Sequence, residues 1–140
     1  MNQLCLNLFQ FSPYVSGGRP VPPIDALLGA AADAGFPLVG LDMYSLETLG
    51  LAPGELAGAL TRHGVACYEM LGLQIDDDEA TALAMTDAVA RWVAESGARQ
   101  VLTVSNGTPD RHWSTGSVGA LIASRRTAPG LRSSFCRSTR

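Results

Sequence analysis

Residues 31–41 read Ala-Ala-Asp-Ala-Gly-Phe-Pro-Leu-Val-Gly-Leu, a stretch that joins the end of a helix to the start of a strand. Gly35 suits the left-handed position that ends a helix, and the apolar run 38–42 after it predicts a strand. Upstream, Pro22 and Pro23 suit the first turn of a helix, where a missing N–H costs little. Apolar residues then recur at the three- and four-residue spacing of a helix with one buried face. They are Ile24, Leu27, Leu28, Ala31 and Ala32.

The same order of helix, glycine and apolar strand occurs three times, with glycines at Gly35, Gly64 and Gly97. The other predicted strands are residues 4–9, 65–71 and 100–105, and the longest helix has Trp92 in its buried row. Apolar strands that alternate with amphipathic helices indicate parallel pairing with right-handed crossovers. We therefore predict an α/β protein with about four parallel strands and three helices. That count equals half of a (β/α)8 barrel and also fits a small open sheet.

The composition of the chain changes at Asp110. Residues 1–110 hold all 13 acidic residues and four of the ten arginines, a formal charge of 4 − 13 = −9. Residues 111–140 hold six arginines and no acid, a formal charge of +6. We expect one unit over residues 1–110 and a basic, irregular Ser/Arg-rich tail over 111–140. That tail is predicted to be disordered or non-native, most simply a frameshifted reading that begins near Ser124.

The cysteines and the apolar runs bear on location. Cys5, Cys67 and Cys136 are odd in number and far apart, which argues against a disulfide framework and for a reducing cytoplasm. The sequence has neither a secretory signal pattern nor an apolar run of the roughly 18 residues that a membrane span needs. We expect a cytoplasmic protein without a membrane partner, and a homo-oligomer is left open.

Residues 31–41 resemble the signature A-x-x-A-G-F-x-x-V-E-L of the sugar phosphate isomerase/epimerase family, in the xylose isomerase-like TIM barrel superfamily that also includes endonuclease IV. Residues 60–66 look like its L-x-x-x-G-L-x-V motif before strand three. Residues 94–101 look like its A-x-x-L-G-A-x-x-V motif before strand four. The resemblance covers about residues 3–108. It implies the N-terminal half of a TIM barrel enzyme that rearranges a sugar or sugar acid with a divalent metal (Mg, Mn or Zn).

Two departures from the family are visible. Gly40 stands where the family usually has glutamate, so Asp42, two residues further along the same strand face, is at best a substitute. The family's metal ligands come from the second half of its barrel, so no metal ligand can be assigned in this chain. The chain alone is therefore expected to be inactive.

Polar residues near the C-terminal strand ends are the site candidates, because β/α barrels place their chemistry there. We assign Glu69 as the catalytic acid or base, with Cys67, Glu69 and Leu71 expected on one strand face. The candidates for substrate binding are Asn7, Asp42, Ser105 and Asn106. Asp42 could instead cap a helix or loop, and Asn7 could bond a neighbouring loop. His63 is read as a cap at a helix C-terminus, and the acidic run 76–79 as the first turn of the next helix.

Two other functions compete with the isomerase/epimerase. The basic tail and the endonuclease IV branch favour nucleic-acid binding, but a −9 body repels phosphate, so nucleic acid is disfavoured as a partner. A small non-catalytic α/β binding module is the other alternative, although it would leave two parallel sheet edges unpaired. A sugar-type small molecule remains the favoured partner of the intact enzyme.

Overall fold

The computed structural model describes residues 4–12, 15, 17, 19–75, 79–105 and 132–137. Strands and helices alternate along most of these ranges, and one short helix follows strand β2 directly. The strands are β1 (Cys5–Asn7), β2 (Leu38–Asp42), β3 (Ala66–Ile75), β4 (Gln100–Ser105) and β5 (Arg132–Arg137). The helices are the 3-10 helix η1 (Leu8–Phe11) and the α-helices α1 (Ile24–Asp33), α2 (Met43–Thr48), α3 (Pro53–His63) and α4 (Glu79–Ser96).

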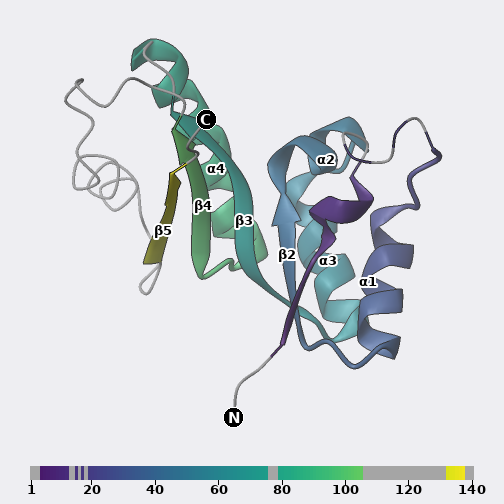
Figure 1. The fold of residues 1–140 in the computed structure, drawn as a ribbon. Helices are drawn as coiled ribbons and strands as arrows, with labels where there is room; N and C mark the ends of the chain where they lie inside the picture. The colour runs from purple at the N-terminus through teal and green to yellow at the C-terminus, as the bar shows by residue number, and fades with distance from the viewer. Residues whose placement is uncertain are drawn as a thin grey trace.

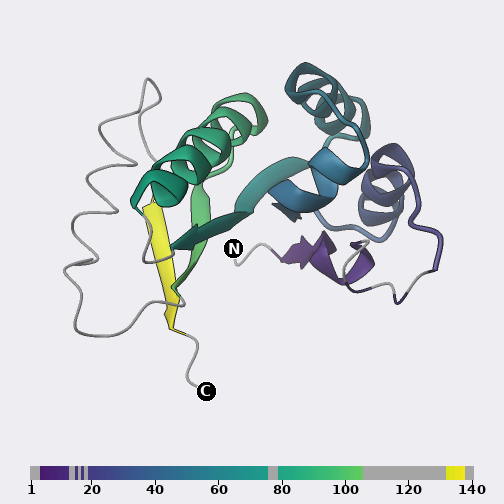
Figure 2. The same ribbon diagram turned by 90° about the horizontal axis from the view of Figure 1, so that it is seen from above.

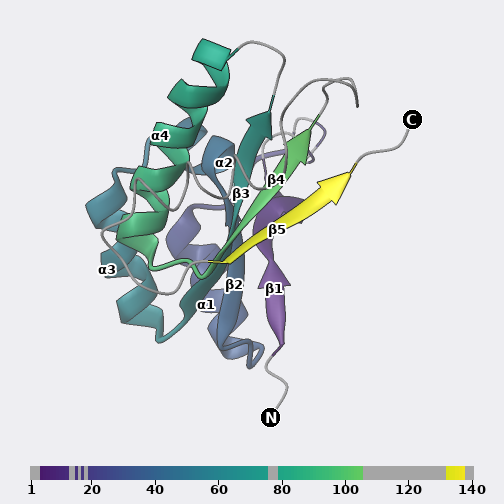
Figure 3. The ribbon, with the colours of Figure 1, turned by 90° about the vertical axis from the view of Figure 1, so that its left-hand side faces the viewer.

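All five strands run parallel in the order β1-β2-β3-β4-β5, so each strand pairs with its neighbour in sequence (Figure 1). The arrows point the same way, and the helices lie along one face of the sheet (Figure 3). Seen from above, the sheet is arched and the helices follow its outer side (Figure 2). This is an open segment of a β/α barrel wall, which confirms the predicted partial TIM barrel.

Element boundaries follow the sequence closely in the middle of the chain. Strands β2 and β4 occupy the predicted residues, while β3 extends four residues further than expected, to Ile75. Gly35, Gly64 and Gly97 adopt the left-handed φ values 81°, 65° and 68° that end their helices. The sequence did not predict the short helix α2 or strand β5. The rest of the predicted tail, and Asp76, Asp77 and Asp78 of the acidic run, lie outside the described residues.

The core lies between the sheet and the helices. The predicted row of α1 packs into it, with Leu28 fully buried and Leu27 partly buried. Trp92 of α4 is also a core residue, as expected. On the sheet, Met70 and Val101 are register partners and are almost fully buried under the helices. None of the described helices is both long and apolar enough to span a membrane.

Candidate functional site

Asn7 and Glu69 meet on the face of the sheet opposite the helices. Asn7 Nδ2 donates to Glu69 Oε1 over 2.9 Å, although the two residues belong to β1 and β3 with β2 between them. The register explains this reach, because Gly40 of β2 pairs with Asn7 on one side and with Glu69 on the other. A Cβ at position 40 would lie 3.3 Å from Glu69 Oε1 and 3.4 Å from Asn7 Nδ2. The glycine therefore leaves the space through which the two side chains bond.

The Asn7 amide is fixed at both ends. Its Oδ1 accepts from the backbone N–H of Phe9 over 2.9 Å and so caps helix η1. That contact requires the oxygen on the Phe9 side, which directs the Nδ2 donor at Glu69. Asn7 therefore caps the 3-10 helix that follows it, instead of bonding a neighbouring loop, and contacts the candidate carboxylate at the same time. Glu69 Oε1 is held, and Oε2 of the partly buried carboxylate accepts no hydrogen bond from the described residues.

A register shift in β3 corrects one prediction about this strand. Val39 pairs with Cys67 and the next residue, Gly40, pairs with Glu69, so Tyr68 is an extra residue in β3. Because neighbouring residues of β2 point to opposite faces, Cys67 and Glu69 do too. The expectation that Cys67 and Glu69 share a face was wrong. Cys67 is buried in the core, 3% exposed, while Glu69 faces away from the helices.

The face around Glu69 has a polar and an apolar half. Leu71 and Leu102 are register partners and only partly buried, whereas their neighbours Met70 and Val101 form part of the core. Alternation along each strand then assigns the remaining side chains of this face. We call its exposed and partly buried members the open face: Cys5, Asn7, Glu69, Leu71, Gln100, Leu102 and Val104. The residues of β2 on the same side of the sheet are buried: Leu38, Gly40 and Asp42.

Asp42 serves a helix in this structure. Its Oδ1 accepts the backbone N–H of Ser45 over 2.7 Å, which caps the N-terminus of α2. The residue is 3% exposed, and one carboxylate oxygen is engaged in this cap. Helix capping, the alternative weighed for Asp42 from the sequence, is thus the role that the structure records. The structure does not bring Asp42 into the hydrogen bond between Asn7 and Glu69.

The last two sequence candidates lie at the end of β4. Ser105 is the final residue of β4 and pairs in register with Ile75 of β3. That places it beyond Glu69 along the strands, since Glu69 pairs with Gln100 at the start of β4. Asn106 lies outside the described residues. Of the five candidates, the structure joins Asn7 and Glu69 directly.

The thiols near the sheet are poor nucleophiles. Burial raises the pKa of the Cys67 thiol to about 12, so the reactive thiolate is scarce at neutral pH. The pKa of the Cys5 thiol is also raised, first by partial burial and then by the negative charge of Glu69. Neither cysteine supports covalent chemistry at this site.

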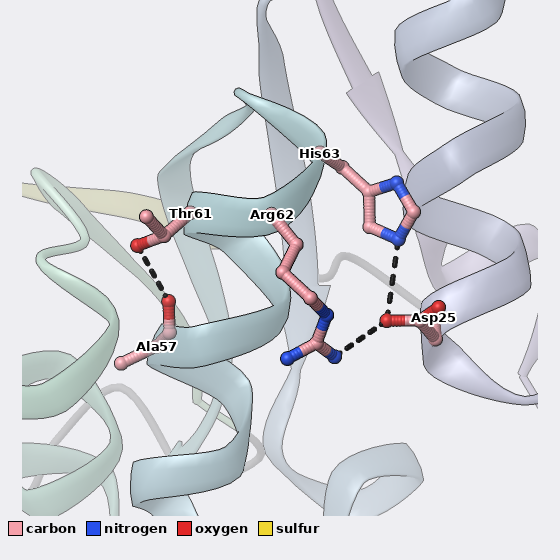
Figure 4. A network of polar contacts seen from close by, with 5 residues as sticks. All are labelled: Asp25, Ala57, Thr61, Arg62 and His63. Atoms are coloured by element: carbon pink, nitrogen blue, oxygen red, sulfur yellow. Dashed lines mark hydrogen bonds and ion pairs between the residues drawn. The ribbon is translucent and has the colours of Figure 1, made fainter.

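A separate group of charges joins α1 to α3 on the helix side. Arg62 Nη2 lies 2.6 Å and His63 Nε2 3.2 Å from Asp25 Oδ1 (Figure 4). The hydrogen bond from Arg62 and the neighbouring His63 ring lower the pKa of the Asp25 carboxyl. The His63 ring packs over Gly29 of α1, where a Cβ would lie 3.2 Å from His63 Cε1. His63 lies in the last turn of α3, as expected for a basic residue at a helix C-terminus, and it also bridges to Asp25 of α1.

The described residues do not make a metal site by themselves. No group of three or more His, Cys, Asp or Glu side chains among them could hold an ion. Both Cys5 and Cys67 lie near Glu69, and the pKa of each thiol is raised rather than lowered. Any divalent ion would need ligands from outside the described part of the chain.

No protein-family model matches the chain, and no curated protein matches it. Solved structures do match. A xylose isomerase-like TIM barrel/4-hydroxyphenylpyruvate dioxygenase fusion protein superposes with a TM-score of 0.68 and 18% identity, over 95% of this chain and 21% of that one. The IolI protein "with a binding zinc atom" superposes with a TM-score of 0.69 and 15% identity, over 97% of this chain and 51% of that one.

An AP endonuclease, family 2, from Brucella melitensis superposes with a TM-score of 0.57 and 15% identity, over 89% of this chain and 48% of that one. The chain has the fold of part of a xylose isomerase-like TIM barrel. It spans between about a fifth and a half of the length of these solved proteins. Sequence identities of 15–18% show a shared fold and leave the function open.

Proposed function

We propose that this chain carries the N-terminal half of a sugar isomerase or epimerase site, with Glu69 as the acid or base. The observation that supports this is the bond between Asn7 and Glu69 through the space left at Gly40. A partly buried carboxylate that is held by one oxygen and accepts no hydrogen bond from the described residues at the other is suited to take a proton from a carbon or hydroxyl beside a carbonyl.

Asn7 positions the carboxylate in this proposal. Its amide is held by the Phe9 N–H, so Glu69 is oriented without help from a substrate. Such preorganisation is what proton transfer between carbohydrate oxygens and carbons requires. Leu71 and Leu102 beside the carboxylate offer an apolar surface for the C–H face of a sugar ring.

A divalent metal belongs to the intact enzyme in this proposal. The zinc atom named for the IolI protein supports that expectation. The residues described here do not form such a site, so no step is assigned to the ion. The isolated chain is expected to bind sugars weakly and to turn none over, with or without added Mg²⁺, Mn²⁺ or Zn²⁺.

The AP endonuclease neighbour supports a nucleic-acid alternative. Residues 1–110 carry a formal charge of −9, and the open face presents a carboxylate, both of which repel phosphate. Binding to an abasic-site duplex that weakens steeply with added salt would favour this alternative. We expect no such binding at physiological salt.

The sugar proposal is tested by NMR titration of the 15N-labelled chain with pentoses, hexoses, inositols and their phosphates. Amide shifts should cluster around Asn7 and Glu69. Glu69→Gln should weaken binding by about ten-fold or more, since a hydrogen bond to a charged group contributes about 1.5–3 kcal/mol. Glu95→Gln, at an exposed position of α4, is the matched control and should leave binding unchanged. Equal effects of the two substitutions, or no shifts with any sugar, would refute the assignment.

A further inference from the structure

A small cavity lies where η1, the end of β2, α2 and the start of α1 meet. Its volume is about 20 Å³, and the residues that line it are apolar except for Ser12, Asp42 and Ser45. Ser12 ends η1, Asp42 caps α2, and Ser45 lies in the first turn of α2. One water molecule needs about 10–15 Å³ of such space. The cavity is therefore large enough for a single water molecule.

The two serines that line this cavity have buried hydroxyl groups. Ser12 is 2% exposed and Ser45 is 8% exposed, and neither Oγ atom has a hydrogen-bond partner among the described residues. Burying a hydroxyl without a partner is costly, so buried hydroxyls in proteins are nearly always bonded to protein groups or to ordered water. Two such hydroxyls beside one water-sized cavity indicate that their common partner lies inside it.

Asp42 adds a charged acceptor at the same place. Its Oδ1 accepts the backbone N–H of Ser45 over 2.7 Å, while the other carboxylate oxygen accepts no hydrogen bond from the described residues. The residue is as deeply buried as the two serines. A buried carboxylate oxygen needs a donor, and the cavity is the space next to Asp42 that can hold one.

Water fits these three groups better than a divalent cation does. A water molecule has two protons and two lone pairs, so it can accept from one serine hydroxyl, donate to Asp42 and bond the other serine in either direction. A cation would take only lone pairs and leave both hydroxyl protons without an acceptor in the cavity. Calcium also takes about 6–8 oxygen ligands, whereas three polar side chains line this cavity.

We propose that Ser12, Asp42 and Ser45 bind one internal water molecule that joins the end of η1 to the start of α2. Asn7 caps the other end of η1 and donates to Glu69, so the water fixes the far end of the element that Asn7 begins. Asp42 then holds a helix and a water molecule, which leaves it no oxygen for a substrate. This inference does not depend on the sugar chemistry proposed above.

The proposal is tested by 17O magnetic relaxation dispersion of the full 140-residue chain, which counts internal water molecules that stay bound longer than the protein takes to tumble. Ser12→Val and Ser45→Val each place apolar volume in the cavity from a different element. Ser12 has an extended backbone, with φ −71° and ψ 156°, which valine adopts readily. Each variant should lose the dispersion amplitude of one water molecule. The double variant should lose no more than either single variant, because both displace the same molecule.

Thr103→Val is the matched control. Thr103 also has a buried hydroxyl without a partner among the described residues, but it does not line this cavity, so its replacement should leave the dispersion unchanged. Circular dichroism checks that each variant is folded. An unchanged amplitude in the folded serine variants, or the loss of two water molecules in the double variant, would overturn the proposal.

A measurement on the wild-type chain keeps the test valid if a variant fails to fold. NOEs at the water frequency should reach the methyl groups of Leu46, which lines the cavity. Their absence, or a wild-type chain without any long-lived water molecule, would show that the cavity is dry and the proposal wrong.

Discussion

The bond between Asn7 and Glu69 is most sharply tested by Asn7→Asp. Aspartate keeps the oxygen that accepts the Phe9 N–H and so preserves the cap of η1. It removes the Nδ2 donor that lies 2.9 Å from Glu69 Oε1 and places a second carboxylate there. The lost hydrogen bond to a charged group costs about 1.5–3 kcal/mol. Like charges about 4 Å apart repel by about 1 kcal/mol in water and about 4 kcal/mol at an effective dielectric of 20.

We expect Asn7→Asp to lower the free energy of unfolding by about 2.5–4 kcal/mol, at the low end of the summed ranges because the open face admits water. Adding Glu69→Gln should restore at least about 1.5 kcal/mol, because the glutamine amide donates to the new carboxylate and one charge is gone. Urea denaturation followed by circular dichroism gives each free energy. The control pairs Asn7→Asp with Glu95→Gln, which should give no restoration.

The test of the hydrogen bond depends on whether the effects of Asn7→Asp and Glu69→Gln on the free energy of unfolding are additive. Two substitutions at sites that do not interact add within about 0.3–0.5 kcal/mol. If Asn7→Asp and Glu69→Gln add within that margin, the two side chains do not share a hydrogen bond, and the site proposed around them is refuted. If Glu95→Gln restores the stability of the Asn7→Asp variant as well as Glu69→Gln does, the loss comes from general charge repulsion among the acidic residues of the protein.

Three further outcomes are expected. Gly72→Ala should lower the free energy of unfolding by about 2–4 kcal/mol in the urea assay, because its φ is 154° and an added Cβ would lie 2.8 Å from Met43 Cβ. Gly54→Ala, where an added Cβ on α3 meets open space, should raise the free energy of unfolding by up to about 1 kcal/mol. Peptide mapping after iodoacetamide treatment at pH 8 should find Cys5 modified in the native protein and Cys67 only after unfolding, since burial raises the pKa of the latter to about 12. The pKa of Asp25 is lower in the folded protein than the value of about 3.9 in the unfolded chain, so the ionised carboxylate stabilises the fold above that pH. The stabilisation is lost as the pH falls through the folded pKa. Asp25→Asn should therefore reduce stability at pH 6 and change it little at pH 2.

Periodicity and glycines were sufficient to predict the layered β/α order. Gly35, Gly64 and Gly97 end helices as expected, because a left-handed residue there is a local requirement that glycine meets cheaply. The buried row of α1 followed from spacing alone. These features depend on neighbours within a few residues, which is the range over which a single sequence is informative.

Strand faces were harder to predict because they depend on pairing. The extra residue at Tyr68 places Cys67 and Glu69 on opposite faces, and a second shift in register occurs at Gly72. A glycine within an apolar run is a recognised sign of a bulge, so Gly72 could have been flagged. Tyr68 carries no such sign. The short helix α2 was missed although Asp42, its cap, had been weighed as a cap, since six residues show little periodicity.

Gly40 shows how a departure from a family pattern can be misread without the register. From the sequence, the missing glutamate put a carboxylate role on β2 in doubt, and Asp42 was the only nearby substitute. In the fold, Asp42 caps α2. Gly40 lies between Asn7 and Glu69, and a Cβ at this position would lie 3.3–3.4 Å from atoms of their side chains. A glutamate side chain there would fill the space through which these residues bond and add a second negative charge beside Glu69. The absence of a side chain at Gly40 is therefore what lets Asn7 of β1 reach Glu69 of β3, so the Glu69 carboxylate is oriented from β1 across β2.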